Sequence, residues 1–273
     1  MPGTTAREAY ERLAPAYDIL TADYRHDRWL AVLEALAREH GLSGHALLDV
    51  ACGTGKSFLP LLARGYRVVG CDISPAMLAR AAEKAPQAQL VQADMRALGR
   101  LGSFDLVTCL DDALNYLVEP AELYAALAGI RLNLQPAGIA IWDLNTLAMY
   151  RSEFATDRMT DRDGHFLAWR GETAAELAAG GPAQATVEVF TPAGDGLWQR
   201  RSSVHRQRHW PHDDVRTIVG RAGLRVLAVH GQHPGAVLDP ALDELVHSKA
   251  VYLACRDDRP AGKEVVPVSI GSI

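Results

Sequence analysis

The sequence contains no long hydrophobic run. No uninterrupted apolar stretch approaches the roughly 18 residues that a membrane-spanning helix needs. The first residues, MPGTTAREAYERL, also lack the apolar segment of a secretory signal peptide. We therefore expect a cytoplasmic protein with no membrane-embedded part.

Cysteine is scarce as well. The four cysteines, Cys52, Cys71, Cys109 and Cys255, never approach a C-x-x-C spacing, and each lies at or near the end of a predicted strand. This arrangement argues against a cysteine-based zinc site and is typical of small buried thiols in a reducing compartment. We expect no metal site.

An excess of positive charge is also missing. The formal net charge is -5, and both signs are spread along the chain, so bulk charge gives no reason to expect binding to nucleic acid. The one basic cluster, RRSSVHRQRH at residues 200–209, is typical of the solvated face of a strand or hairpin. No nucleic-acid partner is expected.

What the sequence does contain is enough apolar material for a large core. The chain has 273 residues, of which 48% are hydrophobic, and this suits one large α/β domain or a domain with an insert. A chain of this size can bury about three quarters of its unfolded surface. Its richness in Ala, Arg and Gly is typical of a GC-rich bacterial genome.

Strands and helices alternate from about residue 45 onward. Segments with helical spacing separate five short apolar runs, HALLDVA, RVVGCD, QLVQAD, FDLVTCL and GIAIWDL. This alternation predicts a Rossmann-like, doubly wound and mostly parallel sheet with helices on both faces. A helix, PHDDVRTIVGRAG, and two further strands, LRVLAVHG and AVYLACRD, follow later in the chain.

The alternation is interrupted between residues 146 and 209, where FLAWRGET, ATVEVFTP and LWQRRSSVHRQRHW indicate antiparallel strands joined by turns. We predict an α/β core of residues 44–145 and 210–256, with 146–209 as a β-rich insert. The insert would lie over the carboxyl edge of the sheet, where open α/β sheets bind ligands. Residues 1–43 are expected to be helical, and 257–273 has the aperiodic pattern of a disordered tail.

The stretch DVACGTGKS, residues 49–57, is a candidate ligand-binding loop. Its ending resembles a phosphate-binding loop, but G-x-x-x-x-G-K-[ST] would require glycine at Val50, where a β-branched residue fits poorly. A dinucleotide loop, G-x-G-x-x-G, would require glycine at Phe58. A nucleotide-binding protein remains an alternative, because FDLVTCLDD is similar to the strand whose aspartate holds magnesium in nucleotide hydrolases.

A third interpretation fits the loop better. Asp49 ends the strand, and small residues follow at alternate positions, namely Ala51, Gly53 and Gly55. Such residues let backbone contact a ligand, and the next helix presents unpaired N–H groups to a carboxylate. We expect Ser57 to cap that helix. The second strand ends at Asp72, at the separation from Asp49 that brings a carboxylate to a ribose diol.

These segments, in this order, resemble the successive motifs of class I S-adenosylmethionine-dependent methyltransferases. The resemblance covers residues 45–145 closely, through LLDVACGTGKSFLPLLARGYRVVGCDISPAMLARA, LVQADMRAL and FDLVTCLDDALNYL. Residues 185–256 are similar to the small-molecule branch of the family. The resemblance implies a seven-stranded sheet with an antiparallel C-terminal hairpin, an N-terminal lid over the cofactor and a substrate cap formed by the insert.

The implied cofactor is S-adenosyl-L-methionine, which leaves as S-adenosyl-L-homocysteine. By the resemblance, Asp49 orders the loop, the small loop residues and Leu110 lie along the methionine moiety, and the ends of the second and third strands hold ribose and adenine. Tyr17 in APAYD matches a tyrosine near the sulfonium. Alanine in place of the first loop glycine should cost little, because its methyl group is small. The implied cofactor-binding residues are Tyr17, Asp49, Ala51, Gly53, Gly55, Asp72, Ile73, Asp94, Met95 and Leu110.

Methyl transfer requires alignment and exclusion of water rather than a metal or a covalent intermediate. A neutral amine acceptor needs little base, whereas a hydroxyl acceptor usually needs one within hydrogen-bond reach. His205 is the candidate base, because strand alternation places it on one face with Gln207 and His209. A packed or exposed structural histidine is the alternative.

Acceptor contacts are expected just beyond the fourth strand, in LDDALNYL. Asp111 and Asp112 could instead cap a helix. The candidate substrate-binding residues are Asp112, Asn115, Tyr116, Gln207 and His209.

We therefore expect an S-adenosylmethionine-dependent methyltransferase that acts on N or O of a small molecule. An amino sugar or another specialised metabolite, of the kind made in antibiotic biosynthesis, fits the resemblance. Alternatives are a nucleotide-binding protein with a phosphate loop, a non-catalytic S-adenosylmethionine-binding module, and an enzyme that moves another group from the sulfonium. The sequence leaves the oligomeric state open, a homodimer included.

Overall fold

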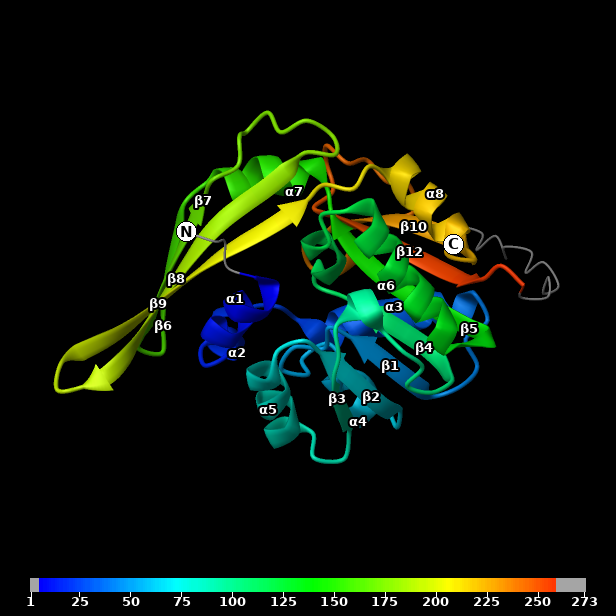
Figure 1. Ribbon diagram of the computed structural model, residues 1–273, viewed down its shortest axis with the longest axis horizontal. Helices are drawn as coiled ribbons and strands as arrows, with labels where there is room; N and C mark the ends of the chain where they lie inside the picture. Colours follow the sequence, from blue (N-terminus) through cyan, green and yellow to red (C-terminus); the bar gives the residue numbers. More distant parts are fainter. Residues whose placement is uncertain (1–4, 259–273) are drawn as a thin grey trace, which may run out of the picture.

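The computed structural model describes residues 5–258 and contains two β-sheets (Figure 1). The main sheet has the strand order β11-β10-β12-β5-β4-β1-β2-β3. Its strands are β1 (Ala46–Val50), β2 (Arg67–Asp72), β3 (Gln89–Gln92), β4 (Phe104–Cys109), β5 (Leu134–Asn145), β10 (Leu224–His233), β11 (Val237–Asp239) and β12 (Lys249–Arg256). The second sheet consists of β6 (Arg158–Arg162), β7 (His165–Gly171), β8 (Pro182–Gly194) and β9 (Leu197–Arg208).

Eight α-helices and three short 3-10 helices accompany these strands within the described residues. The α-helices are α1 (Ala6–Leu13), α2 (Tyr17–Leu20), α3 (His26–Glu39), α4 (Leu59–Ala63), α5 (Pro75–Lys84), α6 (Pro120–Asn133), α7 (Leu147–Ser152) and α8 (His212–Arg221). The 3-10 helices are η1 (Met95–Ala97), η2 (Ala113–Tyr116) and η3 (Glu153–Ala155). No helix in this part of the chain is both long and apolar enough to cross a bilayer.

The predicted fold class is confirmed. Strands β1 to β5 pair in parallel, whereas β12 runs antiparallel to both β5 and β10. The seven predicted strands are present, and β11 adds an eighth, which pairs with the end of β10. This strand spans three residues, too few to show a recognisable alternation in the sequence.

Both faces of the central part of the main sheet are buried, which explains why β1, β4, β5 and β12 are largely apolar. Leu47 of β1 packs on the face covered by α3 and α4, and the next residue, Leu48, packs on the face covered by α6 and α8. Ile141 and Trp142 of β5 alternate in the same way. The sheet therefore forms the middle layer of the molecule and holds the ends of its strands in fixed positions.

Two helix starts show how local sequence sets the chain path. Ser74 caps α5 by accepting a hydrogen bond from the Met77 N–H, and Pro75 follows in the first turn. The predicted cap of α4 is wrong, because that helix begins at Leu59 and the Ser57 hydroxyl instead donates to the buried Asp49 carboxylate. A buried carboxylate needs hydrogen-bond donors, so the Ser57 hydroxyl donates to Asp49 instead of capping the helix.

The second sheet and helices α1 and α2 lie at the carboxyl end of the parallel strands. Figure 1 shows the long β8–β9 hairpin extending away from the main sheet, with α1 and α2 beneath it. Leu13 and Ala16 pack against Val187 and Val189 of β8. The N-terminal segment contains three helices where we expected one or two. Apart from Asp257 and Asp258, the predicted disordered tail lies outside the described residues.

Candidate active site

Two adjoining cavities lie where the carboxyl ends of the parallel strands meet the N-terminal helices. The first follows the loop of residues 49–57, and the second extends beneath the second sheet with a volume of about 610 Å³. Tyr10, Tyr17, Asp111 and Tyr116 line both cavities. Ligand pockets typically occupy about 300–1,000 Å³, so the second cavity, unlike the first at about 80 Å³, is of the size that holds a small molecule.

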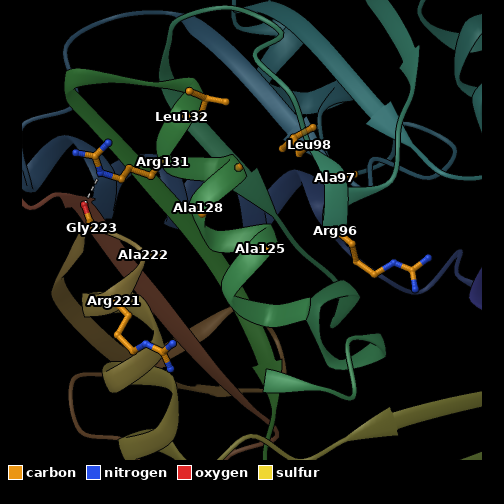
Figure 2. A pocket seen from close by; sticks show the side chains of 11 residues that line it. Arg96, Ala97, Leu98, Ala125, Ala128, Arg131, Leu132, Arg221, Ala222 and Gly223 are labelled. Atoms are coloured by element: carbon orange, nitrogen blue, oxygen red, sulfur yellow. Dashed lines mark hydrogen bonds between the residues drawn. The ribbon is translucent and has the colours of Figure 1, made fainter. Parts of the chain in front are cut away.

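A third hollow, of about 520 Å³, runs along α6 and shares no lining residue with these cavities (Figure 2). Alanines and a glycine of α6 form its floor, and Arg131 at its edge donates to the Gly223 carbonyl oxygen over 2.9 Å. None of the predicted site residues lines it.

The loop at residues 49–57 turns sharply under the first cavity. Ala51, Gly53 and Gly55 all have positive φ, at 57°, 53° and 87°. A Cβ atom at Gly53 would have no neighbouring atom within 4 Å, whereas one at Gly55 would lie 2.8 Å from the Phe58 ring. Gly53 therefore faces open space in the cavity wall, and Gly55 is required by the turn and by packing.

Asp49 holds this loop from below. Its carboxylate is fully buried and accepts hydrogen bonds from the hydroxyls of Ser57 and Thr108, the latter over 2.6 Å. Burial outweighs these hydrogen bonds and raises the pKa of Asp49 to about 7. The carboxylate thus links β1, β4 and the loop, and it lies outside the cavity lining.

Asp72, at the end of β2, fixes the other side of the first cavity. One carboxylate oxygen accepts from the Gly53 N–H over 2.9 Å, and the other accepts from the Ser74 N–H over 2.8 Å. Burial raises the pKa of this carboxyl. A carboxylate has about four acceptor sites, so Asp72 keeps capacity for ligand hydroxyls while it anchors the loop.

The N-terminal segment is tied directly to the same loop. The Thr54 hydroxyl donates to Asp18 over 2.5 Å, and Lys84 of α5 forms an ion pair with Asp18 over 2.6 Å. The Lys56 ammonium donates to the carbonyl oxygen and the hydroxyl of Thr21. Lys56 therefore holds the N-terminal helices over the first cavity.

Asp111 and Asp112 occupy an unusual backbone conformation at the end of β4. Both have positive φ, 58° and 55°, which is costly for residues other than glycine. The buried Asp143 carboxylate of β5 accepts from both backbone N–H groups, over 2.9 Å and 2.6 Å. Lys249 then pairs with Asp143 over 2.9 Å and with Asp112 over 3.1 Å. The turn is held by charge and hydrogen bonding rather than by glycine.

His26 reaches this turn from the start of α3. Its Nε2 lies 2.8 Å from an Asp111 carboxylate oxygen, and its Nδ1 lies 3.1 Å from the Tyr24 carbonyl oxygen. Burial lowers the pKa of His26, but the hydrogen bond and charge of Asp111 outweigh it and hold this pKa above its ordinary value. The imidazole is therefore suited to be a cation with both N–H groups donating.

His205, on β9, lines the second cavity and belongs to a chain of polar side chains. Its Nδ1 lies 2.8 Å from the Tyr116 hydroxyl, and its Nε2 lies 3.0 Å from the Ser203 hydroxyl. The Tyr10 hydroxyl donates in turn to that of Tyr116 over 3.1 Å. Burial lowers the pKa of His205 to about 4, so this histidine is neutral at physiological pH.

Gln207 and Asn115 connect the second sheet to the main sheet. The Gln207 amide donates to Asp112 over 2.5 Å and accepts from Asn145 over 3.0 Å. Asn115 accepts from the Asn145 backbone N–H and donates to the Arg208 carbonyl oxygen, each over 2.9 Å. Asn115 thus joins the end of β5 to the end of β9.

Comparison with known proteins identifies the family. A family model described as "Methyltransferase domain" matches residues 47–138. A protein of Geobacillus sp. (strain WCH70) that carries a methyltransferase name is 29% identical over 226 residues, which cover 81% of this chain and 90% of that protein. The dTDP-3-amino-3,4,6-trideoxy-alpha-D-glucopyranose N,N-dimethyltransferase of Streptomyces venezuelae is 31% identical over 206 residues, which cover 73% of this chain and 84% of that protein. The chain belongs to the S-adenosylmethionine-dependent methyltransferases.

A solved structure shows that the fold agrees with this family. The crystal structure of an S-adenosylmethionine-dependent methyltransferase from Clostridium acetobutylicum ATCC 824 matches with a TM-score of 0.76 at 22% identity. The match covers 90% of this chain and 98% of that one. The methyltransferase is therefore an enzyme whose methyl donor is S-adenosylmethionine, as the sequence predicted, and the phosphate-loop and non-catalytic alternatives fall away.

The lining residues of the first cavity, rather than its volume of about 80 Å³, suit it to this cofactor. Gly53 lets a ligand approach the backbone, and Asp72 offers acceptors at the end of β2, where the sequence placed the ribose. The predicted cofactor residues that line this cavity are Tyr17, Ala51, Gly53, Asp72, Ile73, Met95 and Leu110.

Besides Asp49, two of the predicted cofactor residues do not line this cavity. Gly55 does not line the cavity, because its conformation serves the turn above Phe58. Asp94 does not line it either, since its carboxylate forms an ion pair with Arg96 over 2.6 Å and accepts from the Arg96 backbone N–H. The assumption about Ala51 also needs correction, because its cost comes from a positive φ rather than from methyl size.

Some of the residues predicted to bind the acceptor line the second cavity, and others do not. Asp112, Tyr116 and Gln207 line the second cavity together with His205. Asn115 and His209 do not, since both are fully buried in structural hydrogen bonds, His209 with the Gly180 N–H and with Glu244. Asp112 precedes η2 without a side-chain capping hydrogen bond.

Two functional candidates were missed by the sequence analysis, namely His26 and Lys249. They contact Asp111 and Asp112 across 85 and 137 residues of chain. The only sequence signal for Lys249 is a charged residue at the start of an otherwise apolar strand, KAVYLACR, and His26 has none.

Proposed function

We propose that this methyltransferase transfers a methyl group to a nitrogen atom of a small molecule, and that the acceptor is an amino sugar or a comparable specialised metabolite. The observation that carries the proposal is the composition of the second cavity. Its end next to the first cavity has a carboxylate, Asp111, and tyrosine side chains. The two histidines that line the second cavity, His26 and His205, each have both ring nitrogens in hydrogen bonds.

The only candidate base from the sequence supports a nitrogen acceptor. Catalytic bases work best with a pKa near the operating pH, whereas that of His205 is lowered to about 4. Both of its ring nitrogens already have hydroxyl partners. A hydroxyl acceptor would find no histidine nitrogen free to take its proton here, and an amine needs no base once it is neutral.

The relative from Streptomyces venezuelae supports the same acceptor class. Its name describes an N,N-dimethyltransferase of a dTDP-linked amino sugar, and it aligns with 73% of this chain. The second cavity, of about 610 Å³, has room for a sugar, and its polar groups at Asp112, Gln207 and Lys249 suit hydroxyl-rich ligands.

The residues divide the work between the two cavities. S-adenosylmethionine supplies an electrophilic methyl group on a sulfonium. Asp72, Gly53 and the other cofactor residues bind the donor, while Tyr17 and Tyr116 place π faces and hydroxyls near the boundary, where positive charge is favoured. Asp111 attracts the N–H groups of an acceptor amine. The helices tied down by Lys56 and Asp18 exclude water.

A panel of acceptors tests the proposal. Purified enzyme and S-adenosylmethionine would be incubated with matched pairs of sugars that differ only in an amino or a hydroxyl group at one position, and products would be detected by mass spectrometry. We expect methylated products from the amino member of a pair alone. Methylation of the hydroxyl member, or of protein or RNA while no small molecule reacts, would overturn it. The variant Asp72→Ala serves as the donor-site control.

A further inference from the structure

A separate group of side chains lies at the β10–β11 hairpin, and the proposed reaction does not use it. His233 ends β10, Asp239 ends β11, and His247 lies in the loop before β12. One ligand atom from each of these residues lies within 4.8 Å of the other two. We infer that His233, Asp239 and His247 form a binding site for one divalent transition-metal ion of the Zn²⁺ type.

The spacing of two of these groups suits an ion better than a hydrogen bond. The Nε2 atom of His247 lies 3.7 Å from an Asp239 carboxylate oxygen, which is too long for a hydrogen bond. Ligands at zinc distances on a tetrahedron lie roughly 3.3 Å apart. Small side-chain movements therefore suffice to bring these atoms onto a shared ion.

His247 is held in the orientation that a metal ligand requires. Its Nδ1 lies 3.1 Å from the Asp243 carbonyl oxygen and 2.9 Å from the Asp243 backbone N–H, so either tautomer has a partner. With the proton on Nδ1, the Nε2 lone pair faces Asp239. A carbonyl behind the ligating imidazole is the usual outer-shell arrangement in metal sites.

The surrounding backbone makes room for this imidazole. A Cβ atom at Gly231 would lie 2.2 Å from the His247 Nδ1, so β10 needs glycine there. One Asp239 carboxylate oxygen accepts from the Ala241 N–H over 3.0 Å, which leaves the other directed at His247.

His233 can complete the set. Its ring meets that of His247 edge to face with centroids 4.5 Å apart, and it forms no hydrogen bond with any described residue. Two imidazoles and one carboxylate suit Zn²⁺ or its neighbours, whereas Mg²⁺ and Ca²⁺ prefer oxygen ligands. Our expectation of no metal rested on cysteine spacing, which does not bear on these residues.

A bound ion would fasten one wall of the acceptor cavity. Gln232 and Pro234 flank His233, and Lys249 follows His247 closely; all three line that cavity. The metal would join β10, β11 and the loop before β12, so we expect it to act on acceptor binding and thermal stability. The inference stands independently of which acceptor the enzyme uses.

Calorimetric titration of tag-free protein with ZnCl₂ tests the site. We expect one ion per chain, with affinity at least tenfold weaker in His233→Ala and in Asp239→Asn. The control His165→Ala removes a histidine of β7 and should bind as the wild type does. Cobalt(II) should give a tetrahedral absorption band in the wild type, and that band should be absent from both site variants.

The test uses variants of His233 and Asp239 because these two ligands are partly exposed. His247 is buried, so replacing it would also destabilise the fold. Thermal unfolding of each variant without metal should match the wild type, and added Zn²⁺ should raise the Tm of the wild type alone. Failure of the wild type to bind Zn²⁺ would overturn the inference. So would binding that persists in His233→Ala and Asp239→Asn, or binding that Mg²⁺ reproduces.

Discussion

The imidazole of His26 lies 2.8 Å from the carboxylate of Asp111 and joins α3 to the end of β4. Asp111 lines both cavities, so this pair connects the start of α3 to the boundary between the two cavities. Although burial opposes it, the pair lowers the pKa of Asp111 and raises that of His26. Stability and closure of this region therefore depend on pH.

The pair predicts a loss of stability at alkaline pH. The His26 pKa lies above 6.5 in the fold, so its contribution is complete below 6.5 and is lost as the pH rises through the folded value. The Asp111 pKa lies below 3.8, so its contribution is complete above 3.8 and is lost as the pH falls through the folded value. Denaturant unfolding at about pH 6 and about pH 9 should show His26→Gln to be less stable by about 2 kcal/mol at the lower pH and by less at the higher. A difference that is constant with pH would mean that the imidazole is neutral.

Asp72 should dominate cofactor affinity. Asp72→Ala removes the acceptors at the end of β2 and the support of the Gly53 N–H. A hydrogen bond to a charged group contributes about 1.5–3 kcal/mol, so we expect affinity for S-adenosylmethionine and S-adenosylhomocysteine to fall roughly tenfold to a hundredfold. Isothermal titration calorimetry measures this directly. Glu83→Ala, an exposed change on α5, is the control, and equal affinities in the two variants would refute the assignment.

His205 should act as a positioning residue for Tyr116. We expect His205→Gln to lower kcat/KM by about tenfold or less and to leave the shape of its pH profile unchanged, because a neutral amide can still bond to the Tyr116 hydroxyl. Loss of a general base would cost about 10²–10⁴-fold. Steady-state kinetics across the pH range, with Tyr116→Phe beside it, separates the two roles. A loss of a thousandfold together with a missing acidic limb would restore His205 as the base.

Lys249 should be essential for the Asp111 and Asp112 turn. Its ammonium is the shared partner of Asp112 and Asp143, and their charges, against the effect of burial, raise its pKa. Lys249→Met leaves two carboxylates uncompensated, which costs about 3 kcal/mol and lowers the Tm by roughly 10 °C in a domain of this size. Scanning calorimetry measures the loss. Adding Asp112→Asn should recover part of it, and a double variant no more stable than Lys249→Met would speak against direct pairing.

Ala51→Gly should stabilise the protein. Ala51 has a φ of 57°, where an L-residue pays about 1–2 kcal/mol that glycine avoids, partly offset by glycine's greater entropy loss. We expect a net gain of about 0.5–1 kcal/mol in denaturant unfolding, with cofactor affinity unchanged. Destabilisation by this substitution would show that the alanine methyl group makes a favourable contact.

Much of the fold was predictable from sequence because the central strands β1, β4, β5 and β12 are largely buried and are bounded by polar strand ends. The loop of residues 49–57 was predictable in part, since Gly53 lines the first cavity as its residue type suggests, whereas Ser57 does not cap the next helix. The errors arose where a partner lies far along the chain. Ser57 has a local role available as a helix cap, but the buried Asp49 takes its hydroxyl.

Strand alternation has a second limit, which the second sheet shows. The alternation correctly grouped His205, Gln207 and His209 on one buried face. It could not reveal that the cavity ends before His209, where Glu244 and Gly180 cover the strand. His26 and Lys249 reach the site only through tertiary packing, so no sequence period points to them.

The Asn115 side chain forms hydrogen bonds with the backbone at Asn145, where the chain leaves the main sheet, and at Arg208, where the chain returns. The segment that forms the four-stranded sheet therefore begins and ends beside the same amide side chain. An exchange of that segment between relatives would replace much of the wall of the second cavity and leave the loop of residues 49–57 intact. Such an exchange needs two crossovers, one at Asn145 and one at Arg208, and both lie beside the Asn115 side chain. We expect it to change acceptor selectivity without renewed selection for use of the donor.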